Sequence, residues 1–377
     1  MIDNNKERKI GTRTLWITAI QFLYLFYYLS YSDSLVNTNI ILVAACLILI
    51  IEIIMRIIFN NMKMSVSLLA VCIGSLWAFI CSLINGSGLG SAAIQIFLLL
   101  SICLFADTNM SLVQHKRIMT RMAIILVVIL AIFSKPSPYR SVYMARLLYL
   151  GDSVRINPNC IAMLTFFLFV YLFKVVEETE WRNKYKRFVQ MIILVFSVSY
   201  IYLTSARTAI VSCVIFVVLF FFCKYKNQKL TRTIFLLGLW MSLGIVFIYL
   251  AMYSSGFMVG ETIAGKGFYS GREIIWFEAL DLLKEHLLFG FSNKTTFSVK
   301  NLLSIHNSLL AMVCYFGVLG LLIAISTIYT SFKKIDYKNN ALTVSIILSA
   351  LFFMSFETMI TDWSLVVPYC LLFLHKK

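Results

Sequence analysis

The sequence is poor in charge. Only 13% of its 377 residues are Asp, Glu, Lys or Arg, whereas 60% are hydrophobic. Soluble domains carry about 25% charged residues, and the apolar residues here fall in runs of about 20, the length that spans a bilayer. The composition therefore excludes an ordinary soluble domain and predicts an all-α polytopic membrane protein.

Acidic residues are scarcer than basic ones, which leaves a formal net charge of +16. A basic balance of this size raises the question of nucleic-acid binding. The Lys and Arg residues, however, lie mostly between the apolar runs, as topology signals do, and not on the face of one folded domain. No nucleic-acid partner is therefore expected.

The sequence also lacks the motifs of metal and nucleotide chemistry. None of its nine cysteines forms a CxxC pair, and it contains no His-rich cluster, D-x-D, P-loop or G-x-S-x-G. The cysteines lie in or at the ends of apolar runs, where they act as small buried hydrophobes. We therefore expect no metal, no cofactor and no disulfide. The first apolar run lacks a small-residue cleavage site, so we expect it to be retained as a membrane helix.

The apolar runs predict about twelve membrane helices in a single integral membrane domain, 1–377. If the N-terminus is cytoplasmic, about two thirds of the 33 Lys and Arg residues fall on the inner side, as the positive-inside rule requires. This pattern predicts a protein of the bacterial cytoplasmic (inner) membrane with both termini in the cytoplasm. The runs are 14–30, 38–59, 66–84, 91–107, 118–134, 160–176, 188–203, 208–223, 233–253, 305–331, 341–357 and 363–375.

Two long loops, 135–158 and 254–304, fall on the predicted outer side, and long loops in a compact protein are often functional. The second loop contains SGREIIWFEALDLLKEHLLFG, which predicts an amphipathic helix resting on the membrane surface or over the bundle. Ser270 and Glu273 are spaced as a capping box, and Gly290 is a natural stop. The residues expected on the apolar face are Ile275, Trp276, Ala279, Leu280, Leu282, Leu283 and Leu287, opposite Glu273, Glu278, Asp281, Lys284 and Glu285.

Arginines on the outer side oppose the topology bias and so indicate a function. An arginine holds phosphate by paired hydrogen bonds; the alternatives are solvated loop charge or contact with lipid headgroups. Arg207 lies in a short turn between two apolar runs, where an ionisable group is costly unless it is paired or functional. Arg272 lies in the first helical turn, an anion site, or else it pairs with an acidic neighbour such as Glu273. The outer arginines are Arg140, Arg146, Arg155, Arg207 and Arg272.

His306 lies at the outer start of an apolar run. A histidine there can act as a general base or bind phosphate, although a lone histidine is more often structural. Asp107, Glu357 and Asp362 lie near the ends of runs and are assigned no special role.

Four local patterns follow one another along the chain: RINPNCIA at 155–162, TSARTA at 204–209, SGREIIW leading to LFGF at 270–291, and HNSLL at 306–310, followed by GVLGLL. Together they resemble the O-antigen polymerase and O-antigen ligase superfamily of bacterial membrane glycosyltransferases. The resemblance covers about residues 155–322; the rest of the chain matches in hydropathy alone.

The resemblance implies a metal-independent, inverting sugar transfer on the outer face of the membrane. The donor would be an oligosaccharide on polyprenyl diphosphate, and the product a surface polysaccharide: O-antigen, capsule or another exopolysaccharide. A flippase and a chain-length regulator would be protein partners, with membrane lipid around the chain. The predicted catalytic residues are His306, Arg207 and Arg272. The predicted substrate-binding residues are Arg155, Asn157, Asn159, Arg140 and Arg146, of which Arg140 and Arg146 lie outside the resemblance and are predicted only as outer-side arginines.

Two alternatives stay open. A ligase of the same superfamily would transfer finished glycan to another acceptor. A transporter or flippase of lipid-linked sugar would also have about twelve spans, but such proteins often show internal repeats and Gly- or Pro-interrupted helices. This chain has four prolines and no visible repeat, which favours the transferase.

Overall fold

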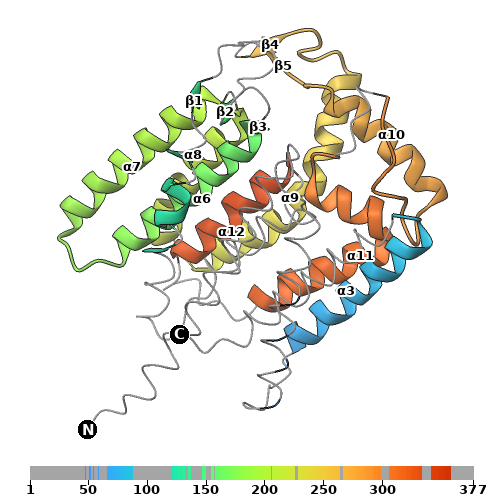
Figure 1. Ribbon diagram of the computed structural model, residues 1–377, viewed down its shortest axis with the longest axis horizontal. Helices are drawn as coiled ribbons and strands as arrows, with labels where there is room; N and C mark the ends of the chain where they lie inside the picture. The colour runs from blue at the N-terminus through green and yellow to red at the C-terminus, as the bar shows by residue number, and fades with distance from the viewer. Residues whose placement is uncertain are drawn as a thin grey trace. The chain divides into compact units, whose positions relative to one another are not determined.

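The computed structural model describes residues 66–87, 158–204, 206–225, 228–263, 266–298, 305–332 and 341–357, with isolated residues and three short strands between 47 and 156. The described chain is mostly helical, as predicted (Figure 1). The number of spans and the single membrane domain stay predictions, since the runs 14–30, 91–107 and 363–375 lie outside the described residues. The chain divides into two compact units: Met1–Glu52, Thr108–Ile215 and Val367–Lys377 in one, and Ile53–Asp107 and Phe216–Val366 in the other.

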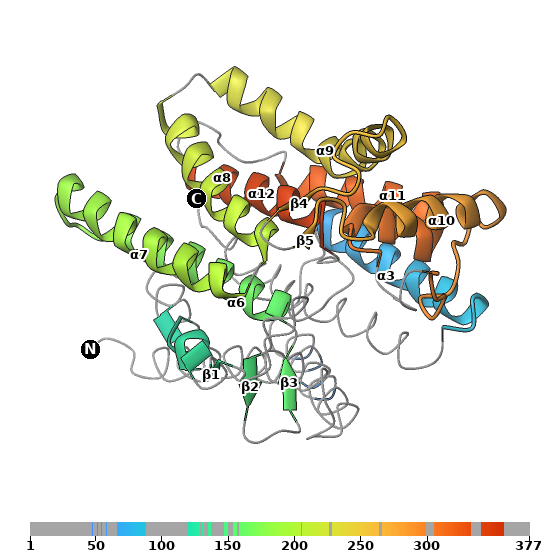
Figure 2. The ribbon, with the colours of Figure 1, turned by 90° about the horizontal axis from the view of Figure 1, so that it is seen from above.

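The first unit contains a pair of packed helices, α6 (Pro158–Glu177) and α7 (Asn183–Leu203). They lie side by side in both views (Figure 1, Figure 2). At the turn between them, Arg187 Nη1 donates to Glu177 Oε2 at 2.8 Å, and Gln190 Nε2 donates to the same oxygen at 3.0 Å. These bonds close the turn and hold the two helices together. Helix α8 (Arg207–Tyr225) begins in this unit, after a short connection.

The second unit is built from α3 (Val66–Ile84), α9 (Gln228–Ser254), α11 (Ser308–Phe332) and α12 (Ala341–Met354). Helix α3 packs along α11, and α12 packs on α9. The described side chains of α12 are nearly all buried, so its polar serines bond to carbonyls of their own helix. This unit carries the site described below.

Two described helices, α7 and α8, are long and apolar enough to cross a membrane, and parts of α3, α9, α11 and α12 form shorter apolar helices. On α7 the side chains of Phe188, Val195 and Phe196 are exposed. A contiguous apolar surface of this kind is unfavourable in water. It fits a helix that faces lipid, in agreement with the membrane prediction.

Both predicted outer loops contain short strands that the all-α prediction missed. In loop 135–158 three strands pair antiparallel in the order β1-β2-β3, and loop 254–304 contains an antiparallel pair. Each strand has two or three residues, too few to show the alternating pattern by which strands are predicted. The strands are β1 (Lys135–Pro136), β2 (Leu147–Tyr149), β3 (Val154–Ile156), β4 (Thr262–Ile263) and β5 (Lys266–Gly267).

The predicted amphipathic helix is present as α10 (Arg272–Glu285), which ends before Gly290. The predicted capping box is wrong. The N-cap is Gly271, in the left-handed conformation at φ 85, and Ser270 Oγ donates instead to Gly267 O at 2.8 Å. The placement of Glu273 on an exposed polar face is also wrong, because Glu273 is buried. The apolar side is confirmed for Ile275, Trp276, Ala279 and Leu283, which are buried.

Helix α11 is broken at Gly317, which has φ 68 and ψ −177. The segment that follows α10 fits against the break. Phe291 N donates to Cys314 O at 2.6 Å, and Val318 N donates to Leu287 O at 3.0 Å. In apolar surroundings, backbone groups freed by a break must find such partners. The contact ties the end of α10 to the middle of α11.

Gly317→Ala should destabilise the protein. A Cβ at this position would lie 1.8 Å from Leu288 O, in a backbone conformation that alanine disfavours. We expect the free energy of unfolding to fall by at least about 2 kcal/mol, measured as a lower thermal midpoint in detergent. The control is Gly244→Ala in α9, where a Cβ meets nothing within 4 Å and helix propensity should raise stability slightly. Equal midpoints for wild type and Gly317→Ala would contradict this account of the break.

Candidate functional site

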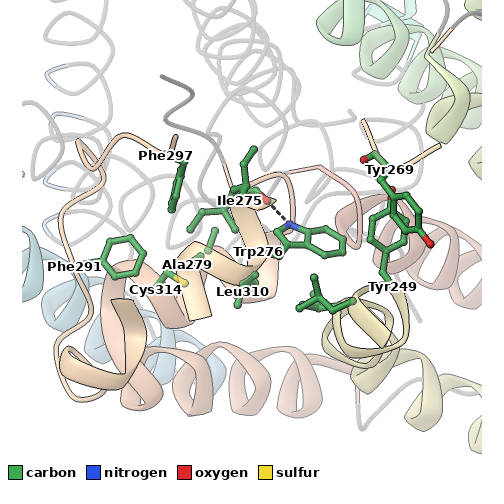
Figure 3. Packing of buried hydrophobic residues seen from close by; sticks show 13 residues of the cluster. Tyr249, Tyr269, Ile275, Trp276, Ala279, Phe291, Phe297, Leu310 and Cys314 are labelled. Carbon is green, nitrogen blue, oxygen red and sulfur yellow. Dashed lines mark hydrogen bonds between the residues drawn. The ribbon is translucent and has the colours of Figure 1, made fainter. Parts of the chain in front are cut away.

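An apolar cluster fixes the start of α10 (Figure 3). At its centre Trp276 is fully buried, and its Nε1 donates to Ile305 O at 2.6 Å, along the dashed line in Figure 3. The ring of Tyr249, on α9, lies 5.0 Å from that of Trp276, and its hydroxyl donates to Tyr269 O at 2.9 Å. Helix α10 is thereby held against α9 and against the residue that precedes His306.

Three ionisable side chains meet beside this cluster: Arg272, His306 and Glu357. Arg272 Nη2 donates to Glu357 Oε1 at 3.1 Å, and His306 Nδ1 lies within hydrogen-bond distance of Glu357 Oε2, at 3.3 Å. The Arg272 guanidinium also lies 5.9 Å from the centre of the Phe356 ring. The Arg272 and Glu357 side chains are 15% and 12% exposed, so their charges interact more strongly than they would in water, and the His306 side chain beside them is 24% exposed. One carboxylate therefore joins two of the predicted site residues.

The sequence patterns did not predict that Glu357 contacts Arg272 and His306. Arg272 was expected to bind an anion or to pair with a neighbour such as Glu273, but its carboxylate partner is Glu357, 85 positions away. The available signal was a carboxylate at the end of an apolar run, where an ionisable group carries a cost unless it is paired. That signal is weak, because charged residues at span ends are common.

Two buried polar atoms at the start of α10 lack a hydrogen-bond partner within the described part of the chain, Arg272 Nε and Glu273 Oε2. An unmet buried donor costs about 1–3 kcal/mol, and the Nε–H of Arg272 is a donor that an anionic oxygen would satisfy. In the first turn of α10 the Arg272 N–H donates to Tyr269 O at 3.2 Å, and any first-turn N–H groups that stay free favour an anion at the same place. Burial raises the pKa of the Tyr269 phenol, with Glu273 and Tyr253 adding to the effect. The neutral phenol donates to Phe257 O at 2.5 Å.

Three other predicted site residues lie in the described part of the chain. Arg207 is the first residue of α8 and is partly buried. Arg155 lies on β3, where its backbone pairs with Leu148 of β2, and Asn159 lies in the first turn of α6. The roles of these residues stay predictions. Arg140, Arg146 and Asn157 lie outside the described residues.

The described chain is mostly helical, and its apolar helices, with a polar cluster at the starts of α10 and α11, are typical of a helical membrane protein. A family model described as O-antigen ligase matches residues 192–325, a stretch that includes Arg207, Arg272 and His306. The match confirms the resemblance to the O-antigen polymerase and ligase superfamily. Proteins of this family are glycosyltransferase-like membrane enzymes of polysaccharide biosynthesis in bacteria. A search of the curated proteins finds no match to the chain.

Proposed function

We propose that this protein is a membrane glycosyltransferase that polymerises oligosaccharide repeat units carried on polyprenyl diphosphate into surface polysaccharide. The observation that carries the proposal is the meeting of Arg272 and His306 at Glu357, in a chain whose residues 192–325 match the family. An arginine can bind a diphosphate by paired hydrogen bonds, and a histidine can accept the proton of an attacking hydroxyl. The donor's diphosphate bond is already activated, so the reaction needs no cofactor.

In the proposed reaction an acceptor hydroxyl attacks the anomeric carbon of the donor sugar, opposite the diphosphate. The new carbon–oxygen bond forms as the bond to the diphosphate oxygen breaks, which inverts the configuration. The electron pair leaves with the lipid diphosphate, and Arg272 stabilises the growing negative charge. The acceptor proton goes to His306. The resemblance assigns Arg207 a share of the charge stabilisation.

The Glu357 carboxylate contacts both Arg272 and His306 and can orient both side chains. If Nδ1 of His306 carries the proton and donates it to Glu357, then Nε2 keeps a lone pair for the acceptor proton. The positive charge that forms on the ring is then stabilised by the carboxylate beside it. If His306 instead binds phosphate, a ring N–H donates to a phosphate oxygen, and the contact with Glu357 orients the ring for that bond.

The substitution His306→Gln separates these two roles, because glutamine donates a hydrogen bond but cannot accept a proton at useful pH. We expect the rate of glycan elongation to fall at least about 100-fold, measured with purified protein and lipid-linked repeat units. The control is His286→Gln, at an exposed position directly after α10, which should keep the rate. Full activity of His306→Gln would reject the base role and leave His306 as a binding or structural group.

The proposal requires loops 135–158 and 254–304 to lie outside the cell and both termini to lie in the cytoplasm. The bias of Lys and Arg supports this topology. In a cysteine-free background, a membrane-impermeant thiol reagent added to intact cells should label Lys294→Cys and should not label Lys184→Cys. Both positions are exposed, so burial does not separate them. Labelling at 184 without labelling at 294 would overturn the topology.

A ligase is the second candidate, because the matching family model is described as O-antigen ligase. In cells that lack the protein, shortened glycan would indicate a polymerase, and unattached glycan of normal length a ligase. A transporter would suit the broken helix α11. In this chain, however, Phe291 N and Leu287 O hydrogen-bond to either side of the break. These backbone bonds favour a structural break over an ion site. A flippase and a chain-length regulator are the proposed protein partners.

A further inference from the structure

We propose that Asn307 is a positioning residue that sets the place of His306 relative to Glu357; the catalytic consequence rests on the proposed function. The inference begins from the backbone of His306, which has φ 54, in the left-handed region. That conformation is unfavourable for a residue with a side chain and persists where the surrounding structure holds it. The neighbours of His306 must therefore supply the restraint.

Asn307 supplies it through three hydrogen bonds. Its fully buried side chain donates from Nδ2 to Ser242 O of α9 at 2.7 Å and to Ser355 O at 2.9 Å, just beyond α12. Its Oδ1 accepts from Leu310 N at 2.8 Å, in the first turn of α11. One side chain therefore joins the start of α11 to α9 and to the segment that follows α12, and both of its amide hydrogens are used.

Ser308 adds a fourth bond to the same place. Its Oγ donates to Glu357 O at 2.7 Å. The two residues that follow His306 therefore bond to the backbone of Glu357, the carboxylate residue, and to the backbone of Ser355, two positions before it. The His306–Glu357 side-chain contact lies across two backbone segments that are already bonded to each other.

The simpler interpretation is that Asn307 only caps α11. Asn, Asp and Ser serve about equally as N-caps, so a capping role predicts that Asn307→Asp is tolerated. Aspartate keeps an oxygen for Leu310 N, but it places its other oxygen against the carbonyl oxygens of Ser242 and Ser355. Only an amide both donates two hydrogen bonds there and accepts one. Asn307→Asp therefore separates a cap from a positioning residue.

In lipid nanodiscs with purified protein and lipid-linked repeat units, Asn307→Asp should lower kcat at least about 30-fold, because a small misplacement of a catalytic group is costly. The KM for the lipid-linked donor should stay within about threefold of wild type. Ser242→Ala and Ser355→Ala are matched controls and should keep kcat, since Asn307 bonds to their backbone oxygens. A wild-type kcat for Asn307→Asp, or a loss that lies in KM alone, would overturn the proposal. If Asn307→Asp fails to insert, Asn307→Ser, which also keeps a cap acceptor, takes its place with the same expected results.

A second measurement does not depend on transferase activity. In a cysteine-free background, His306→Cys and Glu357→Cys are joined by a short bifunctional thiol reagent. Cross-linking should be at least about fivefold slower when Asn307→Asp is added, and unchanged when Ser242→Ala is added. Equal cross-linking with and without Asn307→Asp would reject the positioning role, whatever the activity. Slower cross-linking in the cysteine variants, together with no sugar transfer by the wild-type protein, would support the positioning role and reject the proposed function.

Discussion

Arg272→Ala is expected to abolish long glycan while the protein still inserts into the membrane. The substitution removes the cation assigned to the leaving diphosphate, and loss of one such group typically costs about 100-fold or more in rate. It also leaves Glu357 largely buried and without this partner. Arg272→Lys should rescue poorly, because a point charge cannot bond to Glu357 and to two phosphate oxygens at once. The measurement is polymer length on a gel, with protein quantified in the membrane fraction.

The matched control for Arg272 is Lys284→Ala on the same helix. The Lys284 side chain is 75% exposed, and its hydrogen bond to Asp281 at 2.7 Å raises its pKa, so it is a charged surface residue. Its removal should leave polymer length unchanged. Arg207→Ala should resemble Arg272→Ala if the resemblance assigns its role correctly. Normal polymer from both arginine variants would reject the role of these residues in holding the diphosphate.

Glu357→Ala is expected to be as damaging as Arg272→Ala, although Glu357 lies outside the residues that match the family model. The change leaves Arg272 as a largely buried cation without its carboxylate and removes the group that holds Nδ1 of His306. Glu357→Gln keeps the shape and an acceptor oxygen but not the charge, so it should retain more activity. Elongation rate and thermal midpoint, measured together, separate lost chemistry from lost stability. A fully active Glu357→Ala variant would show that the carboxylate has no part in the reaction.

The pair can also be tested as a unit. Residues in one hydrogen-bonded network are non-additive when substituted together. The double variant Arg272→Ala with Glu357→Ala should therefore lose little more activity than the worse single variant. Losses that multiply would indicate two independent residues and would contradict the shared site.

Local patterns predicted the helices well, because the length and hydropathy of a run are properties of neighbouring residues. The run 160–176 became α6, the run 208–223 became α8, and the helix expected after Ser270 begins at Arg272. Gly290, the residue predicted to stop α10, was a less specific signal. Gly290 does have a positive φ, and its N donates to O of His286, the C-cap of α10, but what requires a glycine there is the backbone of α11, which a Cβ would meet.

The features that were missed depend on contacts between distant residues. Glu357 lies 51 positions from His306 and 85 from Arg272, so no local spacing relates the three. The break at Gly317 likewise depends on the segment after α10, which lies elsewhere in the sequence. Arg272 and His306 were predicted because each lies at the start of a helix on the predicted outer side. Their common partner required the packing of α10, α11 and the end of α12.

The most direct test of the central claim is sugar transfer by the purified protein with one substrate and nothing else. The protein in lipid nanodiscs is given labelled repeat units on polyprenyl diphosphate, without nucleotide, and the products are separated by size. A polymerase predicts a ladder of glycans that grows by whole repeat units, with release of polyprenyl diphosphate, and no ladder from Arg272→Ala. Unchanged substrate under these conditions, and again after addition of lipid or protein acceptors, would contradict the assignment as a glycosyltransferase.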